Sequence, residues 1–300
     1  MNRRGQERGQ EQGQDRKGGG DRVALKKLDE LGGVPGPLAA KAAEAVALVG
    51  SLCPAVVAFS GGVDSSLLLA LAAQACPDRT LAVVASSATY PRRELENARR
   101  IAALVGVPVR VLKTRETEDP AFRANPLDRC YLCKRELFAK IKRLAEDEGY
   151  AGVVEGSNVD DLGDFRPGER ALREAAIASP LRQAGFTKAE VRDLARRLGL
   201  PNWDKPAAAC LASRFPYGAE ITREALARIE RLEEVILDLG FSQARARCHG
   251  DLLRIELEPA GLERAASPEV RDRLVEAARR EGFRYVTLDL GGYRTGSFNP

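Results

Sequence analysis

The residues best suited to chemistry lie in a short turn between an apolar strand and a helix. Residues Ala55–Phe59 have the pattern of a buried strand, and Ser60-Gly-Gly-Val-Asp-Ser-Ser66 leads from it into an apolar helix over 65–75. Glycines let the backbone approach a ligand closely, and the free amides of a turn and of a helix N-terminus favour an anion. The pattern therefore predicts a phosphate-binding loop.

This loop differs from the two common nucleotide fingerprints, because the chain contains neither G-x-x-x-x-G-K-[ST] nor G-x-G-x-x-G. Asp64 would repel a phosphate, so we expect it to hold Mg²⁺ or to orient the turn. A purely structural turn is the alternative interpretation. The expected contacts to the anion come from backbone amides and hydroxyl groups of Ser60, Gly61, Gly62, Ser65 and Ser66.

Six cysteines form the second group of chemically capable residues. Without an export signal they are expected to be thiols, ligands or catalysts and not a disulfide framework. Cys130 and Cys133 form a C-x-x-C pair, and Cys210 stands alone in an apolar-then-basic segment. Cys53 and Cys76 lie in apolar helical surroundings, which predicts small buried hydrophobic residues.

The elements that must position these groups alternate along the first two thirds of the chain. Helical periodicity alternates with short apolar runs, which predicts βαβ units and a parallel, doubly wound α/β sheet covered on both faces. Thr187 and Glu190 form a capping box for a helix that ends near Gly199. Helices are expected over 38–50, 65–75, 91–105 and 134–148, and strands over 55–59, 80–86, 107–112 and 152–155.

The pattern changes near residue 216, which predicts a second, smaller α/β domain over 217–300. It contains a helix over 223–239, strands over 244–248, 252–257 and 285–290, and a helix that begins at Ser267-Pro268. Residues 1–22 contain almost nothing that could enter a core and are expected to be a disordered tail. The ATP-binding domain is then expected over 23–216.

Composition excludes several classes of protein. His249 is the only histidine, which excludes sites built on several histidines and disfavours a Ser-His-Asp hydrolase. A net charge of +4 over 300 residues gives little reason to expect a nucleic-acid partner. No apolar run approaches the roughly 20 residues of a membrane helix, and a cytoplasmic protein is expected.

Two further groups of residues could complete the site. Asn158, Asp160 and Asp161 follow the strand over 152–155 and would lie at the carboxyl edge of the sheet, where such folds bind ligands; a helix cap is the alternative. Arg245 and Arg247 alternate along one strand and so share a face that suits a phosphate. A solvated face is the alternative for these arginines. Glu256 on the next strand could join an acidic metal site.

The phosphate loop resembles that of the ATP pyrophosphatase superfamily. Three other stretches resemble the LarE family of ATP-dependent sulfur transferases, which build the nickel-pincer nucleotide cofactor of lactate racemase. The resemblance runs from about residue 38 to the C-terminus and rests on Asn125–Lys134, on Gly156–Asp161 with Asp164–Gly168, and on Trp203–Gly218.

This resemblance implies roles for individual residues. Cys210 matches the sulfur-donating cysteine, and Lys205 and Arg214 near it would favour a thiolate. Gly156, Asn158, Asp160 and Asp161 would join the loop in binding ATP and Mg²⁺. Arg214, Arg245 and Arg247 match basic residues that hold the substrate's phosphate.

Cys130, Cys133 and Cys210 match a LarE subgroup in which three cysteines hold a 4Fe–4S cluster. A zinc site completed by Cys248 or His249, a redox disulfide and unrelated core thiols are the alternatives. In relatives that have only the Cys210 equivalent, the cysteine gives up its own sulfur and becomes dehydroalanine.

The function expected from this resemblance is thiolation of pyridinium-3,5-biscarboxylic acid mononucleotide. ATP would adenylylate a ring carboxylate, and sulfur would displace AMP. Sulfide or a cysteine-desulfurase-type source would reload the site of a homo-oligomeric enzyme. The alternatives are a tRNA thiolation enzyme, the same reaction with Cys210 as a sacrificial donor, and a nucleotide-sensing or iron-delivering scaffold.

Overall fold

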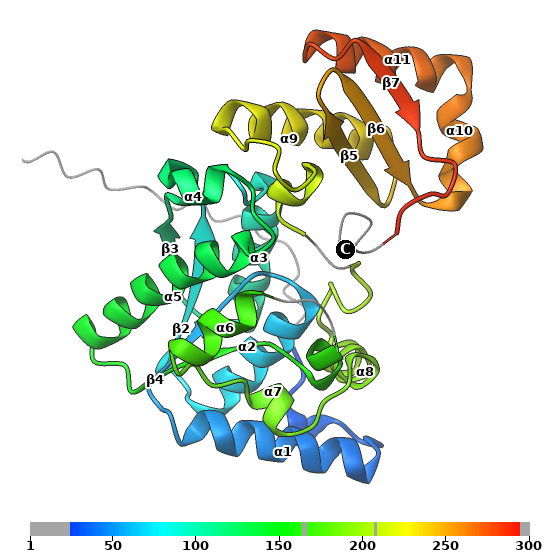
Figure 1. The fold of residues 1–300 in the computed structure, drawn as a ribbon. Coiled ribbons are helices and arrows are strands. Elements are labelled where there is room, and N and C mark those ends of the chain that lie inside the picture. The colour runs from blue at the N-terminus through cyan, green and yellow to red at the C-terminus, as the bar shows by residue number, and fades with distance from the viewer. Residues whose placement is uncertain (1–24, 164–166, 207–208, 295–300) are drawn as a thin grey trace, which may run out of the picture.

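The computed structural model describes residues 25–163, 167–206 and 209–294, and they form two lobes (Figure 1). The larger lobe contains a four-stranded sheet and the smaller, C-terminal lobe a three-stranded sheet. The predicted α/β class is confirmed. The expected tail over 1–22 lies outside the described residues.

The four strands of the large sheet are parallel and follow the order β3-β2-β1-β4. The chain moves outward from β1 to β2 and β3 and then returns to the other side of β1, so the topological switch point lies between β1 and β4. All four strands were predicted within two residues. Their bounds are Ala55–Ala58 for β1, Thr80–Ser86 for β2, Val109–Lys113 for β3 and Gly152–Glu155 for β4.

Helices cover both faces of this sheet because alternate strand residues point to opposite sides. Ala55 and Val57 pack into a core with α1, α2, α3 and α8, whereas Val56 packs into a second core with α5 and α6. The bounds are Gly36–Gly50 for α1, Val63–Ala75 for α2, Arg92–Val105 for α3, Arg129–Asp147 for α5, Gly168–Glu174 for α6 and Lys188–Leu198 for α8.

Two boundaries differ from the prediction in ways that matter. Helix α5 begins at Arg129 and not at residue 134, so Cys130 and Cys133 lie in its first turn. Strand β3 begins at Val109, after Pro108, whose missing N–H cannot contribute to a strand ladder. The connections also contain short elements: η1 (Leu28–Glu30), η2 (Glu116–Glu118), α4 (Pro120–Arg123), η3 (Val159–Gly163), α7 (Pro180–Gln183) and η4 (Leu211–Arg214).

The C-terminal lobe has strand order β5-β6-β7, with β5 and β6 antiparallel and β6 and β7 parallel. Helix α9 packs on β5, and apolar residues of both join one core. The bounds are Arg223–Asp238 for α9, Ala244–His249 for β5, Leu252–Leu257 for β6, Pro259–Gly261 for η5, Leu262–Ala266 for α10, Pro268–Arg280 for α11 and Tyr285–Leu288 for β7.

Cys53 and Cys76 are not separate thiols as predicted; the structure joins them in a disulfide, with Cα atoms 5.8 Å apart. The physical reason is topological. Helix α2 runs back antiparallel to β1, so the residue after the helix returns to the residues before the strand. The two cysteines are 23 residues apart in sequence, and local patterns carry no signal for such a pairing.

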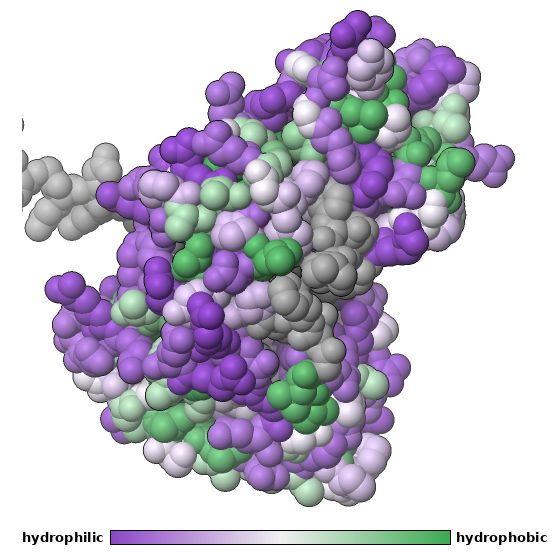
Figure 2. All heavy atoms as spheres, viewed as in Figure 1, coloured by the Kyte–Doolittle hydropathy of each residue, from purple (hydrophilic) through white to green (hydrophobic). Residues whose placement is uncertain are grey.

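The outer surface is dominated by polar residues. In the view of Figure 2, hydrophilic side chains cover most of both lobes and hydrophobic ones occur in small groups. Among the described helices, none combines the length and the apolar character that crossing a membrane requires.

The separate core of the C-terminal lobe leads to a first prediction. Replacing Ile255, which is 1% exposed, by alanine should destabilise this lobe by about 3 kcal/mol through lost burial and a residual cavity. Hydrogen exchange followed by mass spectrometry should show faster exchange in β5, β6 and β7 with little change in β1 and β2. Equal acceleration in both sheets would show that the lobes unfold as one unit.

Candidate active site

The loop after β1 has the shape of an anion site. Gly61 has a φ of +67°, and a Cβ at this position would lie 2.9 Å from the Cβ of Ala98 on α3. The Ser60 and Ser65 hydroxyls lie 3.1 Å apart, and the Ser65 hydroxyl donates to the Gly62 carbonyl at 3.1 Å. The loop therefore combines a backbone that only glycine tolerates with an internal hydroxyl network at the start of α2.

Two residues that the sequence analysis missed hold this loop from outside. The Asn202 amide donates to the Gly61 carbonyl and to the Ser66 hydroxyl, both at 3.0 Å. The Tyr90 hydroxyl donates to the Ser60 carbonyl at 2.7 Å. Burial, and then Glu94, raise the pKa of Tyr90, so this donor keeps its proton. Ser66, predicted to contact the anion, is fully buried beneath the loop.

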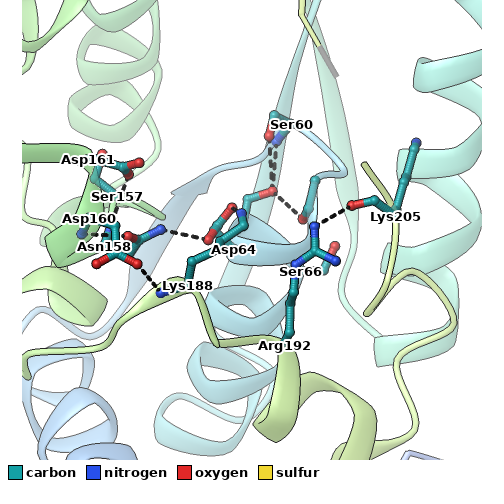
Figure 3. A network of polar contacts seen from close by, with 12 residues as sticks. Ser60, Asp64, Ser66, Ser157, Asn158, Asp160, Asp161, Lys188, Arg192 and Lys205 are labelled. Carbon is teal, nitrogen blue, oxygen red and sulfur yellow. Dashed lines mark hydrogen bonds and ion pairs between the residues drawn. The ribbon is translucent and has the colours of Figure 1, made fainter. Parts of the chain in front are cut away.

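Asp64 lies at the predicted edge of the sheet beside the residues that follow β4 (Figure 3). The Asn158 amide donates to Asp64 at 2.9 Å, and Lys188 of α8 forms an ion pair with the same carboxylate. The backbone N–H of Lys188 donates to Asp160 at 2.7 Å. The sequence analysis expected Asp64 and Asn158 on the same side of the sheet but did not predict their contact. Lys188 was missed because its contact depends on how α8 packs.

The residues after β4 also have the geometry of a helix cap, which was the alternative interpretation of Asn158, Asp160 and Asp161. The Asn158 side chain accepts from the backbone of Asp160 at 3.0 Å, and Asp161 accepts from the backbone of Asn158 at 3.0 Å. Close packing explains why residue 156 is a glycine, because a Cβ there would lie 2.8 Å from the Ser65 backbone nitrogen. The first residues after β4 are thus pressed against the phosphate loop.

The three cysteines of the predicted cluster influence one another's pKa: Cys210 acts on Cys130, and both act on Cys133. Burial, and then Cys210, raise the pKa of Cys130, which Arg129 and Lys134 lower in part. Burial, and then Glu116, raise the pKa of Cys133 well above its ordinary value. Within the three described ranges, however, no three His, Cys, Asp or Glu side chains are arranged to hold a metal ion.

Glu116 is another residue that the sequence analysis missed. It is 3% exposed, and one carboxylate oxygen accepts hydrogen bonds from the Ser87 and Thr89 hydroxyls. Its other oxygen is buried and has no hydrogen-bond partner in the part of the chain that the structure describes. An anion held in this way beside Cys133 disfavours a second negative charge there, which accounts for its effect on the thiol pKa.

Arg214 contacts the Cys210 segment differently from the prediction. Its guanidinium pairs with Glu233 through two hydrogen bonds of 2.8 Å and donates to the Cys210 carbonyl at 3.0 Å. Arg214 therefore supports the backbone of Cys210, and Lys205 forms an ion pair with Glu94 on α3.

Arg245 and Arg247 lie on one strand, β5, as predicted, and both are buried, so the alternative of a solvated face is wrong. Arg247 donates to the Ser213 carbonyl at 2.6 Å and to Glu256 at 2.9 Å. Arg245 stacks over Tyr293, with 4.8 Å from its guanidinium carbon to the ring centre. Burial, and then Arg214, lower the pKa of Arg245. The three arginines are thus brought together.

Glu256 does not form the acidic metal site that the sequence analysis considered. Its two carboxylate oxygens accept from Arg247 and Arg254 at 2.9 and 3.0 Å. The carboxylate therefore balances the charge of the arginines.

A cavity of about 150 Å³ lies where the two lobes meet around Cys210. Ala209 and Leu211, the two neighbours of Cys210, both line it. Its other walls come from the start of α3, from the 205–206 segment and from α9 and β5; among them are Glu94, Lys205, Arg214, Glu233 and Arg245. The cavity thus connects the cysteine segment with the predicted phosphate-binding arginines.

Comparison with known proteins agrees with this geometry. The asparagine synthase family profile matches residues 39–126, which include the phosphate loop. An uncharacterized protein of Synechocystis sp. is 43% identical over 83% of this chain and 93% of its own. Pyridinium-3,5-bisthiocarboxylic acid mononucleotide synthase of Lactiplantibacillus plantarum is 38% identical over 87% of this chain and 95% of its own. A GMP synthase of Aeropyrum pernix is 27% identical over 67% of this chain and 43% of its own.

The glycine loop between β1 and α2, at the switch point of a parallel sheet, defines the class of phosphate-loop proteins of the ATP pyrophosphatase type. The similarity to the Lactiplantibacillus protein extends over both lobes and nearly the whole relative. The chain belongs to the LarE family.

The contact of Gly156 with the loop leads to a second prediction. Gly156→Ala must displace the Ser65 backbone, so we expect a loss of about 1–3 kcal/mol in unfolding free energy and weaker ATP binding. Chemical denaturation and calorimetry would measure both. Gly50→Ala is the matched control, because a Cβ there meets nothing within 4 Å. Unchanged ATP affinity in Gly156→Ala would contradict the close approach.

The raised pKa of Cys133 gives a third prediction. Because the Cys133 thiol stays protonated at neutral pH, its labelling by iodoacetamide in the metal-free protein should rise only above pH 9. The labelling rate at each pH is expressed as a fraction of the maximal rate of the same protein. Peptide mass spectrometry across pH 7–10 would follow it. Glu116→Gln removes the neighbouring charge and should move the profile to lower pH. A wild-type pH profile like that of free cysteine would show that the pKa of Cys133 is not raised.

Proposed function

We propose that this protein is an ATP-dependent sulfur transferase that thiolates pyridinium-3,5-biscarboxylic acid mononucleotide. The proposal rests on one observation above others. The phosphate loop and the segment carrying Cys210 are joined by hydrogen bonds in one molecule that is similar to the Lactiplantibacillus synthase over 87% of its length. An activating site and a sulfur nucleophile must be adjacent for such a reaction.

The first half of the reaction activates the carboxylate. A ring carboxylate oxygen attacks the α-phosphorus of ATP, the bond to the β-phosphate breaks, and pyrophosphate leaves. The loop amides and the start of α2 would hold the leaving pyrophosphate. Mg²⁺ would bind Asp64 on the ATP side by displacing the Lys188 ammonium and the Asn158 amide that contact this carboxylate, with Asp160 nearby as the acceptor of the Lys188 backbone N–H.

The second half transfers sulfur. If the Cys210 thiolate attacks the acyl adenylate, AMP leaves with the original carboxylate oxygen and a thioester to Cys210 forms; loss of the Cys210 Cα proton and cleavage of its Cβ–Sγ bond then leave a thiocarboxylate on the ring and dehydroalanine in the protein. If a sulfide held near Cys210 is the nucleophile, displacement of AMP would give the thiocarboxylate directly. Two rounds would give the bis-thiocarboxylate. Arg214, through the Cys210 carbonyl, keeps this nucleophile in place.

Thiols are a donor set suited to a 4Fe–4S cluster, and Cys130 and Cys133 lie one turn apart on α5 while Cys133 and Cys210 pack against the same core. Because the described residues do not present three such ligands together, the side chains would have to turn toward one another to hold a cluster. A cluster held by Cys130, Cys133 and Cys210 would leave one iron open to an extra sulfide for repeated transfer. Without it, Cys210 would give up its own sulfur.

The arginines of the smaller lobe would hold the substrate's phosphate. Arg245 carries a pKa lowered by burial and by Arg214, and a dianion would relieve this repulsion. Arg214 and Arg247 would bind the incoming phosphate while keeping their ion pairs with Glu233 and Glu256. The proposal extends to a cytoplasmic homo-oligomer that is reloaded by sulfide or a cysteine-desulfurase-type donor.

The fourth prediction tests the route of the sulfur. Protein purified without oxygen should contain about four irons and four acid-labile sulfides per chain, and Cys130→Ala and Cys210→Ala should both lose them. Wild-type protein given ATP and the mononucleotide should release pyrophosphate over several turnovers. Iron and sulfide analysis with a pyrophosphate assay measures both.

Other outcomes distinguish the alternatives. Iron-free protein that thiolates once, with Cys210 converted to dehydroalanine in its intact mass, would establish the sacrificial route. Binding of ATP with no pyrophosphate release in the presence of the mononucleotide would refute the proposed function. Tight, salt-sensitive tRNA binding would favour tRNA thiolation instead.

A further inference from the structure

The segment that carries Cys210 is bonded directly to the phosphate loop upstream of the cysteine and, downstream of it, to the chain at residues 89–90 that also contacts the loop. On the upstream side, the Asn202 amide donates to Gly61 and Ser66. On the downstream side, the Leu211 N–H donates to the Thr89 carbonyl at 2.8 Å. The next residue, Tyr90, donates through its hydroxyl to Ser60. Hydrogen bonds therefore tie residues on either side of Cys210 to the loop, through Asn202 directly and through Leu211 by way of residues 89–90.

Asparagine at position 202 is unfavourable for stability alone, because its side-chain amide is buried and only partly hydrogen-bonded. The residue is 6% exposed, and its two N–H bonds both go to the loop. Its side-chain oxygen is buried and has no hydrogen-bond partner among the described residues. A buried acceptor without a donor destabilises a fold, and an apolar side chain of similar size would avoid this. What the amide contributes must then come from its contacts with the loop.

We propose that Asn202 is a positioning residue that fixes the ATP-binding conformation of the phosphate loop and couples it to the accessibility of Cys210. The Gly61 carbonyl must point away from a bound phosphate so that the loop's amides can face it, and Asn202 holds that carbonyl. The bond to Ser66 secures the first turn of α2. Asn202 and Cys210 lie on one connection, so ordering the loop also orders the cysteine.

This inference rests on the proposed function, because it assumes that the loop binds ATP. It does not depend on the iron–sulfur cluster, on the acceptor or on the source of sulfur. Trp203, the only tryptophan in the chain, is 37% exposed and follows Asn202 directly. Its fluorescence therefore reports on this connection.

The fifth prediction concerns Asn202→Ala in the metal-free full-length protein. Loss of two neutral hydrogen bonds should weaken MgATP binding about 20-fold by calorimetry, with the midpoint of thermal unfolding changed by less than about 4 °C. In the wild-type protein, saturating MgATP should slow alkylation of Cys210 about threefold or more, measured on its peptide, and shift Trp203 fluorescence. In Asn202→Ala, at MgATP concentrations that restore saturation, the alkylation rate should no longer respond.

Two variants act as controls. Asn97→Ala changes a partly buried asparagine on α3 whose side-chain carbonyl accepts from Arg100 and, within the described residues, forms no hydrogen bond with the loop. It should leave MgATP affinity and the response of Cys210 unchanged. Ser66→Ala removes one of the two acceptors, so it should weaken binding less than Asn202→Ala. Added to Asn202→Ala, it should have little further effect, because both changes break the same bond.

Three results would overturn the inference. These are wild-type MgATP affinity in Asn202→Ala, a persistent alkylation response in that variant, and no effect of MgATP on Cys210 in the wild-type protein. If Asn202→Ala does not fold, Ser66→Ala with wild-type affinity would also overturn it. Failure of the wild-type protein itself to bind MgATP would instead refute the proposed function, so the two failures are distinguishable.

Discussion

The close approach of three segments to one short loop is the constraint on which the rest of the site depends. Gly61 lies against α3 where a Cβ would collide with Ala98, and Gly156 lies against Ser65 in the same way. Asn202 adds a hydrogen-bonded contact from a third direction. A loop held on three sides loses little conformational entropy when it binds a ligand, which is the physical advantage of a preorganised anion site.

Buried charge organises the other half of the site. Arg214 with Glu233 and Arg247 with Glu256 are nearly inaccessible to water. Removing one partner of such a pair typically costs about 3–5 kcal/mol, because the other charge remains buried alone. These pairs hold the carbonyls of Cys210 and Ser213, so the same guanidinium groups that suit a substrate phosphate also fix the backbone around the cysteine.

The thiols lie in an environment that disfavours free thiolates. Burial raises the pKa of Cys130 and Cys133, and the half-satisfied carboxylate of Glu116 adds to this for Cys133. Such thiols react slowly with alkylating agents and oxidants at neutral pH, because the thiolate is the reactive form. A bound metal or cluster would reverse the balance, since coordination stabilises the deprotonated sulfur. Cys130 and Cys133 are therefore poor free nucleophiles at neutral pH.

The sequence by itself determined the alternation of strands and helices, the glycine-containing loop between β1 and α2, the capping box at Thr187 and the position of Asn158 directly after β4 at the sheet edge. These features depend on local periodicity, on turn chemistry and on the rule that parallel strands end at a common edge. Only the tertiary structure decided the partners of Asp64, Gly61 and Arg214, which are Lys188, Asn202 and Glu233, and the pairing of Cys53 with Cys76. Such pairings join residues far apart in the chain, and a single sequence contains no periodic or local signal for them because they depend on how whole elements pack.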